Sequence, residues 1–385
     1  MPKEIKNLER TAKRIIKAVK KKENIILYGD ADLDGLAAVV IMKESIRSLG
    51  GKIKAVYFPE RQKEGYGLNL FALKYLKKYA PALLILLDCG ISNFEEAQKA
   101  KKFGFELIII DHHEVIDKLP EASIIVAPKQ KGDRYPFKQL ATAGIVFRLS
   151  RLFFGRKFSP KLRQSLLELA ALATIADLMP QKHDNRIIVK KGLASLRKTL
   201  RPGLKVFWKM KDISPYSSTG EIAQKIISSL NFSEVKNHLI EAYSLLSATD
   251  ERTARIISES ILEKNYFRHL KVKEIVEETA LRNSANVGSP IVFEGASNWE
   301  AILLGSAASK ICHKFNKPTF ILRKGKQETR GAVRMPKNLD GIEAMKTCAK
   351  YLITFGGHPA AAGFTIKNKN LEKFKLCLVK YFHEI

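Results

Sequence analysis

Three aspartates, Asp30, Asp32 and Asp34, alternate directly after the short apolar run Ile25–Leu27. Side chains of extended backbone point to opposite faces in turn, so alternate residues share one side. Three carboxylates on one side repel each other unless a cation lies between them. Carboxylate oxygens are hard donors that suit Mg²⁺ or Mn²⁺. The stretch therefore predicts a divalent-metal site at the end of a strand.

Two other interpretations of this stretch explain less. A helix N-terminus favours negative charge, which accounts for one aspartate but not for three that alternate. An EF-hand loop also opens with Asp-x-Asp-x-Asp-Gly. That loop needs a Glu ligand at its twelfth position, where this chain has Ile41, and it follows a helix instead of a strand. We therefore keep the metal site as the prediction.

Apolar runs typical of strands alternate with helical patterns in the first part of the chain. Buried apolar strands that alternate with helices predict a parallel sheet with both faces covered. We therefore expect an α/β fold whose N-terminal domain is a doubly wound, mostly parallel sheet. The expected strands are Ile25–Leu27, Ile53–Phe58, Leu83–Leu87, Leu107–Ile110 and Ile124–Val126, and the expected helices are 4–22, Leu36–Leu49, Leu70–Lys78 and Phe94–Phe103.

Polar side chains follow two further strands of this sheet. Asp88 comes directly after one predicted strand, and Asp111, His112 and His113 come directly after the next. Sites in parallel sheets lie beyond the carboxyl ends of the strands. A single aspartate there can be an ordinary helix cap. Three strand ends that all carry carboxylate or imidazole favour one composite metal site.

The remaining chain is predicted to be helical and then mixed. We expect helices at Gln139–Phe154, Pro160–Ala176, Arg186–Leu200 and from Thr219 to about Asn283, then strands at Pro290–Glu294, Ala301–Leu304, Thr319–Leu322 and Thr329–Arg334, with helices at Ala307–Phe315 and Gly341–Tyr351. Asp177, at the end of an apolar helix, can be either a cap or a ligand. The stretch Gly356–Gly363 can be either a close approach to phosphate or a tight turn.

Composition narrows the class of protein. Lys and Arg outnumber Asp and Glu by 67 to 39, which gives a net charge of +28. Such an excess favours a polyanionic partner, usually nucleic acid, although a solvated Lys-rich surface is the alternative. Cys89, Cys312, Cys348 and Cys377 form no Cys-x-x-Cys pair, which predicts reduced thiols with neither a disulfide framework nor a zinc knuckle.

The sequence also predicts a cytoplasmic protein with no membrane partner. No apolar run approaches the length of a membrane span. The first residues contain no apolar signal region, which argues against secretion.

Taken together, the motifs resemble the DHH phosphoesterase superfamily, and within it the RecJ-like exonucleases that carry a C-terminal DHHA1 domain. The resembling stretches are Gly29–Gly35, Asp88–Ser92, Asp111–His113 and Thr174–Pro180, followed in the C-terminal part by Gly305–Lys310, Arg330–Arg334 and Gly356–Gly363. The compact, Lys-rich form is similar to archaeal members.

The resemblance implies a site with two Mn²⁺ or Mg²⁺ ions. The implied metal ligands are Asp30, Asp32, Asp34, Asp88, His112 and Asp177, and which of the first three bind directly stays open. Catalytic roles fall on Asp34, Asp111 and His113, of which His113 orients or protonates the phosphate. The implied contacts to nucleic acid or phosphate are Ser309, Lys310, Arg330, Arg334, Gly357 and His358.

The implied function is that of a metal-dependent exonuclease. It would hydrolyse single-stranded DNA or RNA to nucleoside monophosphates in DNA replication or repair, with a replication or helicase complex as an expected partner. An alternative is a phosphodiesterase for very short oligonucleotides, cyclic dinucleotides or adenosine bisphosphate, which would gain little from a charge of +28. A catalytically silent scaffold is disfavoured because the metal motifs are intact. The polarity of digestion and the oligomeric state stay open.

The resemblance also implies a domain organisation. We expect a DHH catalytic, metal-binding domain at 1–200, a helical connector at 201–285, and a smaller α/β DHHA1 substrate-binding domain at 286–385.

Overall fold

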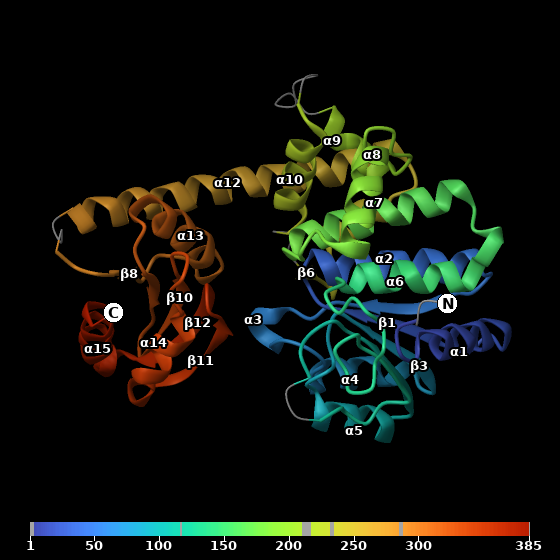
Figure 1. The fold of residues 1–385 in the computed structure, drawn as a ribbon, viewed down its shortest axis with the longest axis horizontal. Coiled ribbons are helices and arrows are strands. Elements are labelled where there is room, and N and C mark those ends of the chain that lie inside the picture. The colour runs from blue at the N-terminus through green and yellow to red at the C-terminus, as the bar shows by residue number, and fades with distance from the viewer. Residues whose placement is uncertain (1–3, 116–117, 210–216, 232–234, 285–287, 385) are drawn as a thin grey trace. The chain divides into compact units, whose positions relative to one another are not determined.

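The computed structural model describes residues 4–115, 118–209, 217–231, 235–284 and 288–384. The chain divides into two compact units, Met1–Leu262 and Glu263–Ile385, and each has its own sheet (Figure 1). Among the described helices, none is both long and apolar enough to cross a membrane.

The first unit contains a five-stranded parallel sheet with strand order β2-β1-β3-β4-β5. Its strands are β1 (Ile25–Gly29), β2 (Ile53–Tyr57), β3 (Ala82–Leu87), β4 (Phe105–Ile110) and β5 (Ile124–Val126). The predicted strands and the parallel α/β architecture are therefore confirmed.

Helices cover both faces of this sheet (Figure 1). Leu27 and its alternate neighbours share one core with α1 (Leu8–Lys20), α2 (Leu33–Ser48), α6 (Thr142–Phe154) and α7 (Pro160–Ala176). Ile26 and Tyr28 point to the other face, where α4 (Leu70–Leu76) and α5 (Phe94–Lys102) pack. Because both faces are buried, β1, β3 and β5 are apolar at every position instead of alternating. The exceptions are Lys54 on the edge strand β2 and Glu106 near the start of β4.

The end of the first unit departs from the prediction. It contains α8 (His183–Leu196), α9 (Pro202–Trp208), α10 (Thr219–Leu230), α11 (Glu241–Leu246) and the start of the long helix α12 (Glu251–Ser284). The prediction of helices throughout this region is wrong between α10 and α11, where β6 (Val235–Lys236) and β7 (Leu239–Ile240) form a hairpin. The two turn residues, Asn237 and His238, have φ of 50° and 61°, as a two-residue hairpin turn requires.

The second unit also has a five-stranded sheet, with order β11-β12-β10-β9-β8. The pairs are antiparallel except that β8 (Val292–Ala296) runs parallel to β9 (Thr319–Lys324). The other strands are β10 (Glu328–Arg334), β11 (Leu352–His358) and β12 (Ala361–Lys367). Helix α13 (Leu304–Phe315) packs on one face, and α14 (Gly341–Thr347) and α15 (Leu371–His383) pack on the other.

Two predictions for this unit are wrong. The expected strand Ala301–Leu304 is a 3₁₀ turn that leads into α13, because Leu304 packs with Ala307 and Ala308 at helical spacing. The expectation that all cysteines are reduced fails for Cys348 and Cys377, which form a disulfide. The packing of α15 against α14 brings these residues, 29 positions apart, to a Cα separation of 6.0 Å.

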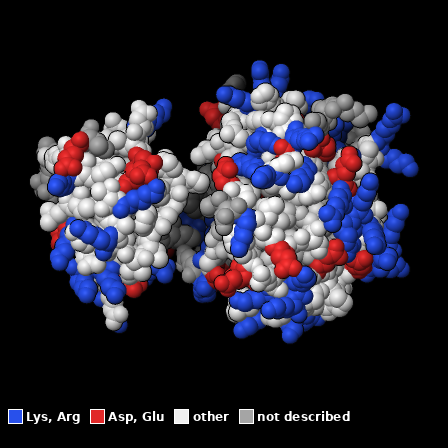
Figure 2. All heavy atoms as spheres, turned by 60° about the horizontal axis from the view of Figure 1, so that its bottom comes forward, with Lys and Arg blue, Asp and Glu red and all other residues white. Residues whose placement is uncertain are grey.

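The charge excess is visible on the surface. On the face drawn in Figure 2, Lys and Arg side chains cover much more area than Asp and Glu on both units. This distribution agrees with the expectation of a polyanionic partner.

Candidate metal centre

Asp30, Asp88 and Asp111 lie side by side at the carboxyl edge of the first sheet. Each continues the hydrogen-bond ladder by one residue beyond its strand: the amide nitrogens of Asp30, Asp88 and Asp111 donate to Leu87, Ile110 and Val126 at 3.0–3.1 Å. The parallel register therefore brings together three aspartates that are far apart in the sequence. Asp88 has a left-handed backbone, with φ of 65°.

Asp32 and Asp34 are tied to helix N-termini. The Asp32 side chain accepts hydrogen bonds from the amides of Asp34 and Gly35, both at 3.1 Å, and so caps α2. Asp34 is buried and accepts from the amides of Thr142 and Ala143, at 2.7 and 2.8 Å, where α6 begins. The first amides of a helix have no acceptor within the helix, so they favour a negatively charged side chain at this end.

His112 lies among three carboxylates. Its Nε2 atom is 3.3 Å from Asp177 Oδ2, 3.5 Å from Asp88 Oδ1 and 4.0 Å from Asp34 Oδ2. Both ring nitrogens of His112 and the Oδ2 atom of Asp177 are buried without a hydrogen-bond partner in the described residues. Buried polar atoms usually have partners, so these atoms point to a ligand that would occupy the space between them.

His113 is held differently from His112. Its Nδ1 atom donates to Asp111 Oδ1 at 2.7 Å, and Asp111 also accepts from the amides of His113 and Ile91, both at 3.1 Å. The other ring nitrogen, Nε2, lies 3.4 Å from the Tyr66 hydroxyl. Asp111 therefore fixes the orientation of the half-exposed imidazole of His113.

Arg61, at the start of the short helix α3 (Arg61–Glu64), pairs with two of the aspartates. Its Nε atom donates to Asp30 Oδ1 at 2.9 Å, and its Nη2 atom contacts Asp30 Oδ2 and, at 3.0 Å, Asp32 Oδ2. The guanidinium thus supplies positive charge beside carboxylates that would otherwise repel each other.

Burial sets the charge states in this cluster. Burial, together with the charges of neighbouring carboxylates, raises the pKa of Asp34 and Asp88 well above the ordinary value. Burial and then the charge of Asp32 raise the pKa of Asp177 to about 6. Burial and then the charge of His113 lower the pKa of His112 to about 4. His112 is therefore neutral near pH 7, as a metal ligand must be.

The donors fall into three groups that could each hold a metal ion. They are Asp30, Asp32 and Asp88; Asp34, His112 and Asp177; and Asp88, His112 and His113, with the ligand atoms of each group within 4.8 Å of one another. Oxygen and imidazole donors of this kind suit Mn²⁺ or Mg²⁺. The residues therefore fit a divalent-metal centre, and the six predicted ligands all lie in it. Asp111 is in none of these groups.

In the second unit, the register brings several of the predicted phosphate contacts together. Arg334 of β10 and His358 of β11 both pair with Ala361 of the strand between them, so they lie in one row. Arg334 Nε also donates to Ser309 Oγ of α13 at 3.0 Å. Gly357 lies next to His358, and Lys310 next to Ser309. Arg330 lies four residues earlier on β10, about 13 Å along the strand.

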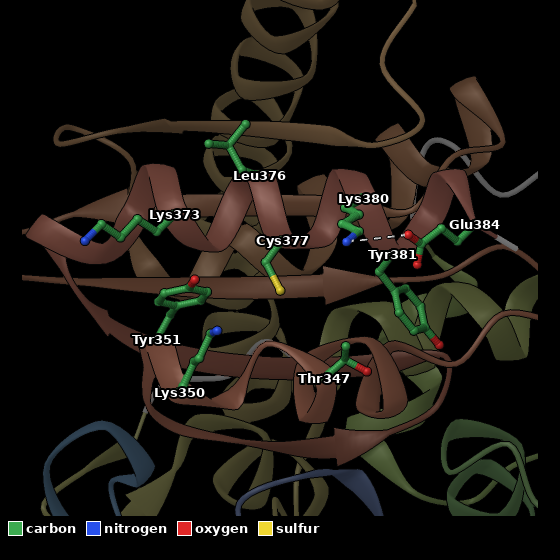
Figure 3. Close-up of a pocket in the computed structure, with 9 residues that line it drawn as sticks. All are labelled: Thr347, Lys350, Tyr351, Lys373, Leu376, Cys377, Lys380, Tyr381 and Glu384. Atoms are coloured by element: carbon green, nitrogen blue, oxygen red, sulfur yellow. Dashed lines mark ion pairs between the residues drawn. The ribbon is translucent and has the colours of Figure 1, made fainter.

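A separate pocket of about 510 Å³ lies in the second unit beside the disulfide (Figure 3). Its lining residues are Thr347, Lys350, Tyr351, Lys373, Leu376, Cys377, Lys380, Tyr381 and Glu384. None of the predicted phosphate contacts lines it. Val333 packs with α14 and α15, so the adjacent Arg334 points to the opposite face of the sheet from these helices.

The sequence reasoning missed three residues that contact the centre. Arg61 and Tyr66 lie in the segment after β2, and Thr142 Oγ1 donates to Asp88 Oδ1 at 2.9 Å. Arg61 and Tyr66 could have been predicted from the topology. Because β2 is parallel to β1, the segment that follows β2 leaves the sheet at the same edge as the aspartates. No feature of the sequence indicated that Thr142 would contact the centre.

Comparison with known protein families agrees with this geometry. Residues 24–174 match the DHH family N-terminal domain, and residues 288–384 match the DHHA1 domain. The chain belongs to the DHH family. The two matched segments contain all the predicted site residues except Asp177, which lies just beyond the first.

Several DHH-family relatives are single-stranded-DNA-specific exonucleases named RecJ. The one from Bacillus subtilis is 33% identical over 375 residues, which are 96% of this chain and 47% of the relative. The one from Thermus thermophilus is 28% identical and covers 98% of this chain and 54% of the relative. This chain thus spans about half the length of these relatives.

Solved structures agree on the fold. A crystal structure of exonuclease RecJ bound to manganese has a TM-score of 0.82 and 24% identity, and the match covers 100% of this chain and 96% of that one. The Mn²⁺ complex of RecJ from Thermus thermophilus has a TM-score of 0.83 and 23% identity, and the match covers 56% of that chain.

Proposed function

We propose that this protein is a metal-dependent exonuclease that hydrolyses single-stranded DNA and releases nucleoside monophosphates. The observation that carries the proposal is the cluster of His112 with Asp34, Asp88 and Asp177, in which buried donor atoms lack hydrogen-bond partners among the residues that the structure describes. The relatives whose names describe single-stranded-DNA-specific exonucleases support this substrate, and the net charge of +28 suits a polyanion.

The proposed ligands of two Mn²⁺ or Mg²⁺ ions are Asp30, Asp32, Asp34, Asp88, His112 and Asp177. Divalent cations bound there would supply Lewis-acid chemistry, since they lower the pKa of water toward neutrality and neutralise charge on a phosphate. The manganese- and magnesium-bound RecJ structures support the choice of ion.

Protein groups near the proposed ions would orient the phosphate. His113, fixed by Asp111, directs Nε2 away from that carboxylate and can donate a hydrogen bond or a proton to a phosphate oxygen. Asp34 keeps its carboxylate in place through two amides of α6. In the second unit, Ser309, Lys310, Arg330, Arg334, Gly357 and His358 are the proposed contacts to the phosphates of the strand.

The domain boundaries, the cellular role and the partner are also proposals. We assign a DHH catalytic domain to 1–200, a helical connector to 201–285 and a DHHA1 substrate-binding domain to 286–385. We further propose a cytoplasmic role in DNA replication or repair, with a replication or helicase complex as partner.

A time course with Mn²⁺ on end-labelled strands tests the proposal. Strands carrying the label at the 5′ end, or at the 3′ end, should release a labelled mononucleotide at once from one end only. An RNA version of each strand tests the sugar preference. His112→Ala should lower the rate by at least about a hundredfold, whereas His269→Ala, which changes an exposed histidine of α12, should not.

Two outcomes would contradict the proposal. Full activity of His112→Ala would remove that residue from the metal centre. Turnover of dinucleotides or adenosine bisphosphate without any cleavage of long strands would replace the exonuclease with a small-substrate phosphodiesterase.

A further inference from the structure

Leu178 is an apolar side chain held in solvent directly beside the metal centre. It follows Asp177, whose Oδ2 atom lies 3.3 Å from His112 Nε2. Its exposed fraction is 89%, the highest among the large apolar residues that the structure describes. Its φ is 54°, in the left-handed region that side chains other than glycine and asparagine seldom adopt.

The backbone around Leu178 forms a helix-ending motif that normally uses glycine. The amide of Leu178 donates to Ile175 O and the amide of Met179 donates to Thr174 O, both at 3.1 Å, after the last residue of α7. This is the Schellman arrangement, with Leu178 at the left-handed position. The same pair of hydrogen bonds ends α2, and there the left-handed position is Gly50, with φ of 84°.

Folding does not explain a leucine at this position. The motif itself would be formed with less strain by glycine or asparagine. An exposed leucine gains no burial energy either, because its side chain stays in water. The position directly after Asp177 gives a reason for the leucine, because strained backbone conformations cluster where a ligand binds.

We propose that Leu178 is a substrate-binding residue that packs against the nucleoside of the nucleotide whose phosphate lies at Asp177 and His112. The inference rests on the proposed function, because it requires a nucleotide substrate. The flat faces of bases and the carbon edge of the sugar are apolar, and apolar side chains commonly stack against them. Consecutive Cα atoms are 3.8 Å apart, so a side chain at 178 is within reach of a group bound at Asp177.

The matched control comes from the other end of the same unit. Helix α1 ends in the same motif, with Lys22 at the left-handed position, where its φ is 55°. The backbone amide of Lys22 donates to Val19 O, and the backbone amide of Glu23 donates to Ala18 O. Lys22 precedes β1, so it lies at the amino edge of the sheet, away from the metal centre at the carboxyl edge. Lys22→Gly therefore makes the same change of backbone at a site without a role in binding.

The experiment compares Leu178→Gly, Leu178→Met and Lys22→Gly with the unchanged protein. Two ester substrates with the same nitrophenol leaving group are used with Mn²⁺: nitrophenyl thymidine monophosphate, which carries a nucleoside, and methyl nitrophenyl phosphate, which does not. Single-stranded DNA is the third substrate. The temperature of unfolding is recorded for each variant.

Leu178→Gly should raise KM for the strand and for the thymidine ester by about tenfold, the effect of losing one buried leucine contact. The methyl ester should be hydrolysed at an unchanged rate, and the unfolding temperature should not fall. Leu178→Met should keep most of the affinity, because methionine also supplies an apolar surface. Lys22→Gly should match the unchanged protein on all three substrates.

The possible failures are distinguishable. If the unchanged protein degrades strands and Leu178→Gly does so with the same KM, the role of Leu178 is refuted and the exonuclease stands. Equal loss on the methyl ester would show that Leu178 acts through Asp177 instead of through the nucleoside, which also refutes the inference. If the unchanged protein leaves all strands and the thymidine ester intact, the proposed function fails and the inference fails with it.

Discussion

Replacing Asp34 by alanine should destabilise the metal-free protein, whereas replacing Asp177 by alanine should not. Both residues are proposed metal ligands, but only Asp34 also holds the fold together. Its carboxylate accepts from the amides of Thr142 and Ala143, at 2.7 and 2.8 Å, at the start of α6. Within the described part of the chain, Asp177 Oδ2 has no hydrogen-bond partner, and it lies near other carboxylates.

The magnitude follows from these contacts. Each hydrogen bond to a charged group contributes about 1.5–3 kcal/mol, so the two bonds to Asp34 contribute about 3–6 kcal/mol. Burial and then the charge of Asp177 raise the pKa of Asp34, which shows that its ionised form is partly disfavoured. After allowing for the opposing cost of a buried carboxylate, we expect a net loss of about 2–3 kcal/mol in Asp34→Ala, at or below the lower end of that range. Asp177→Ala removes one of the repelling charges and should change stability by less than about 1 kcal/mol, toward greater stability.

Urea unfolding in EDTA measures the difference. The chain has two tryptophans, Trp208 in the first unit and Trp299 in the second. In a Trp299→Phe background, fluorescence of Trp208 reports the unfolding of the first unit alone. Calorimetric titration with Mn²⁺ serves as the second readout, and both variants should bind the ion more weakly. An equal loss of stability in the two variants would refute the argument that Asp34 secures α6.

Three further predictions use other contacts. Arg61→Ala should tighten Mn²⁺ binding severalfold in a calorimetric titration, because the guanidinium competes with the ion for Asp30 and Asp32. Weaker binding would mean that Arg61 orients these two ligands instead. Cys348→Ser should lower the stability of the second unit by about 3.5 kcal/mol, from the entropy of a 29-residue loop, and reductant should abolish the difference. Arg334→Ala should weaken strand binding about tenfold while sparing a small phosphodiester. Its control is Lys373→Ala, which changes an exposed lysine of α15 on the opposite face of the sheet.

The first sheet and its edge followed from the sequence because two simple rules apply there. Apolar runs separated by helical patterns fix a parallel sheet, and the carboxyl ends of parallel strands meet at one edge. Asp30, Asp88 and Asp111 were therefore predicted together, and the structure has them in one register. The position of Asp177 beside His112 could not be derived from pattern alone, because it depends on how α7 packs against the sheet.

The failures have equally specific causes. A four-residue apolar run such as Ala301–Leu304 has no length over which a strand and a helix differ, so periodicity cannot separate them. The turn at Asn237 and His238 depends on two left-handed residues inside a region of helical composition. The pairing of Arg61 with Asp30 joins residues from different loops, and sequence spacing does not indicate which loops fold back onto the site.

The contacts also divide the residues of the centre into two kinds. Asp32 caps α2, Asp34 secures α6 and Asp111 holds His113, so these carboxylates are fixed by the protein itself. His112 and Asp177 carry buried atoms that nothing in the described residues satisfies. The first kind keeps the geometry of the site before any ion binds, and the second kind leaves donor atoms for the ion. Asp32 and Asp34 are proposed to do both, because their hydrogen bonds to helix N-termini do not depend on an ion. We therefore expect the metal-free protein to keep its fold.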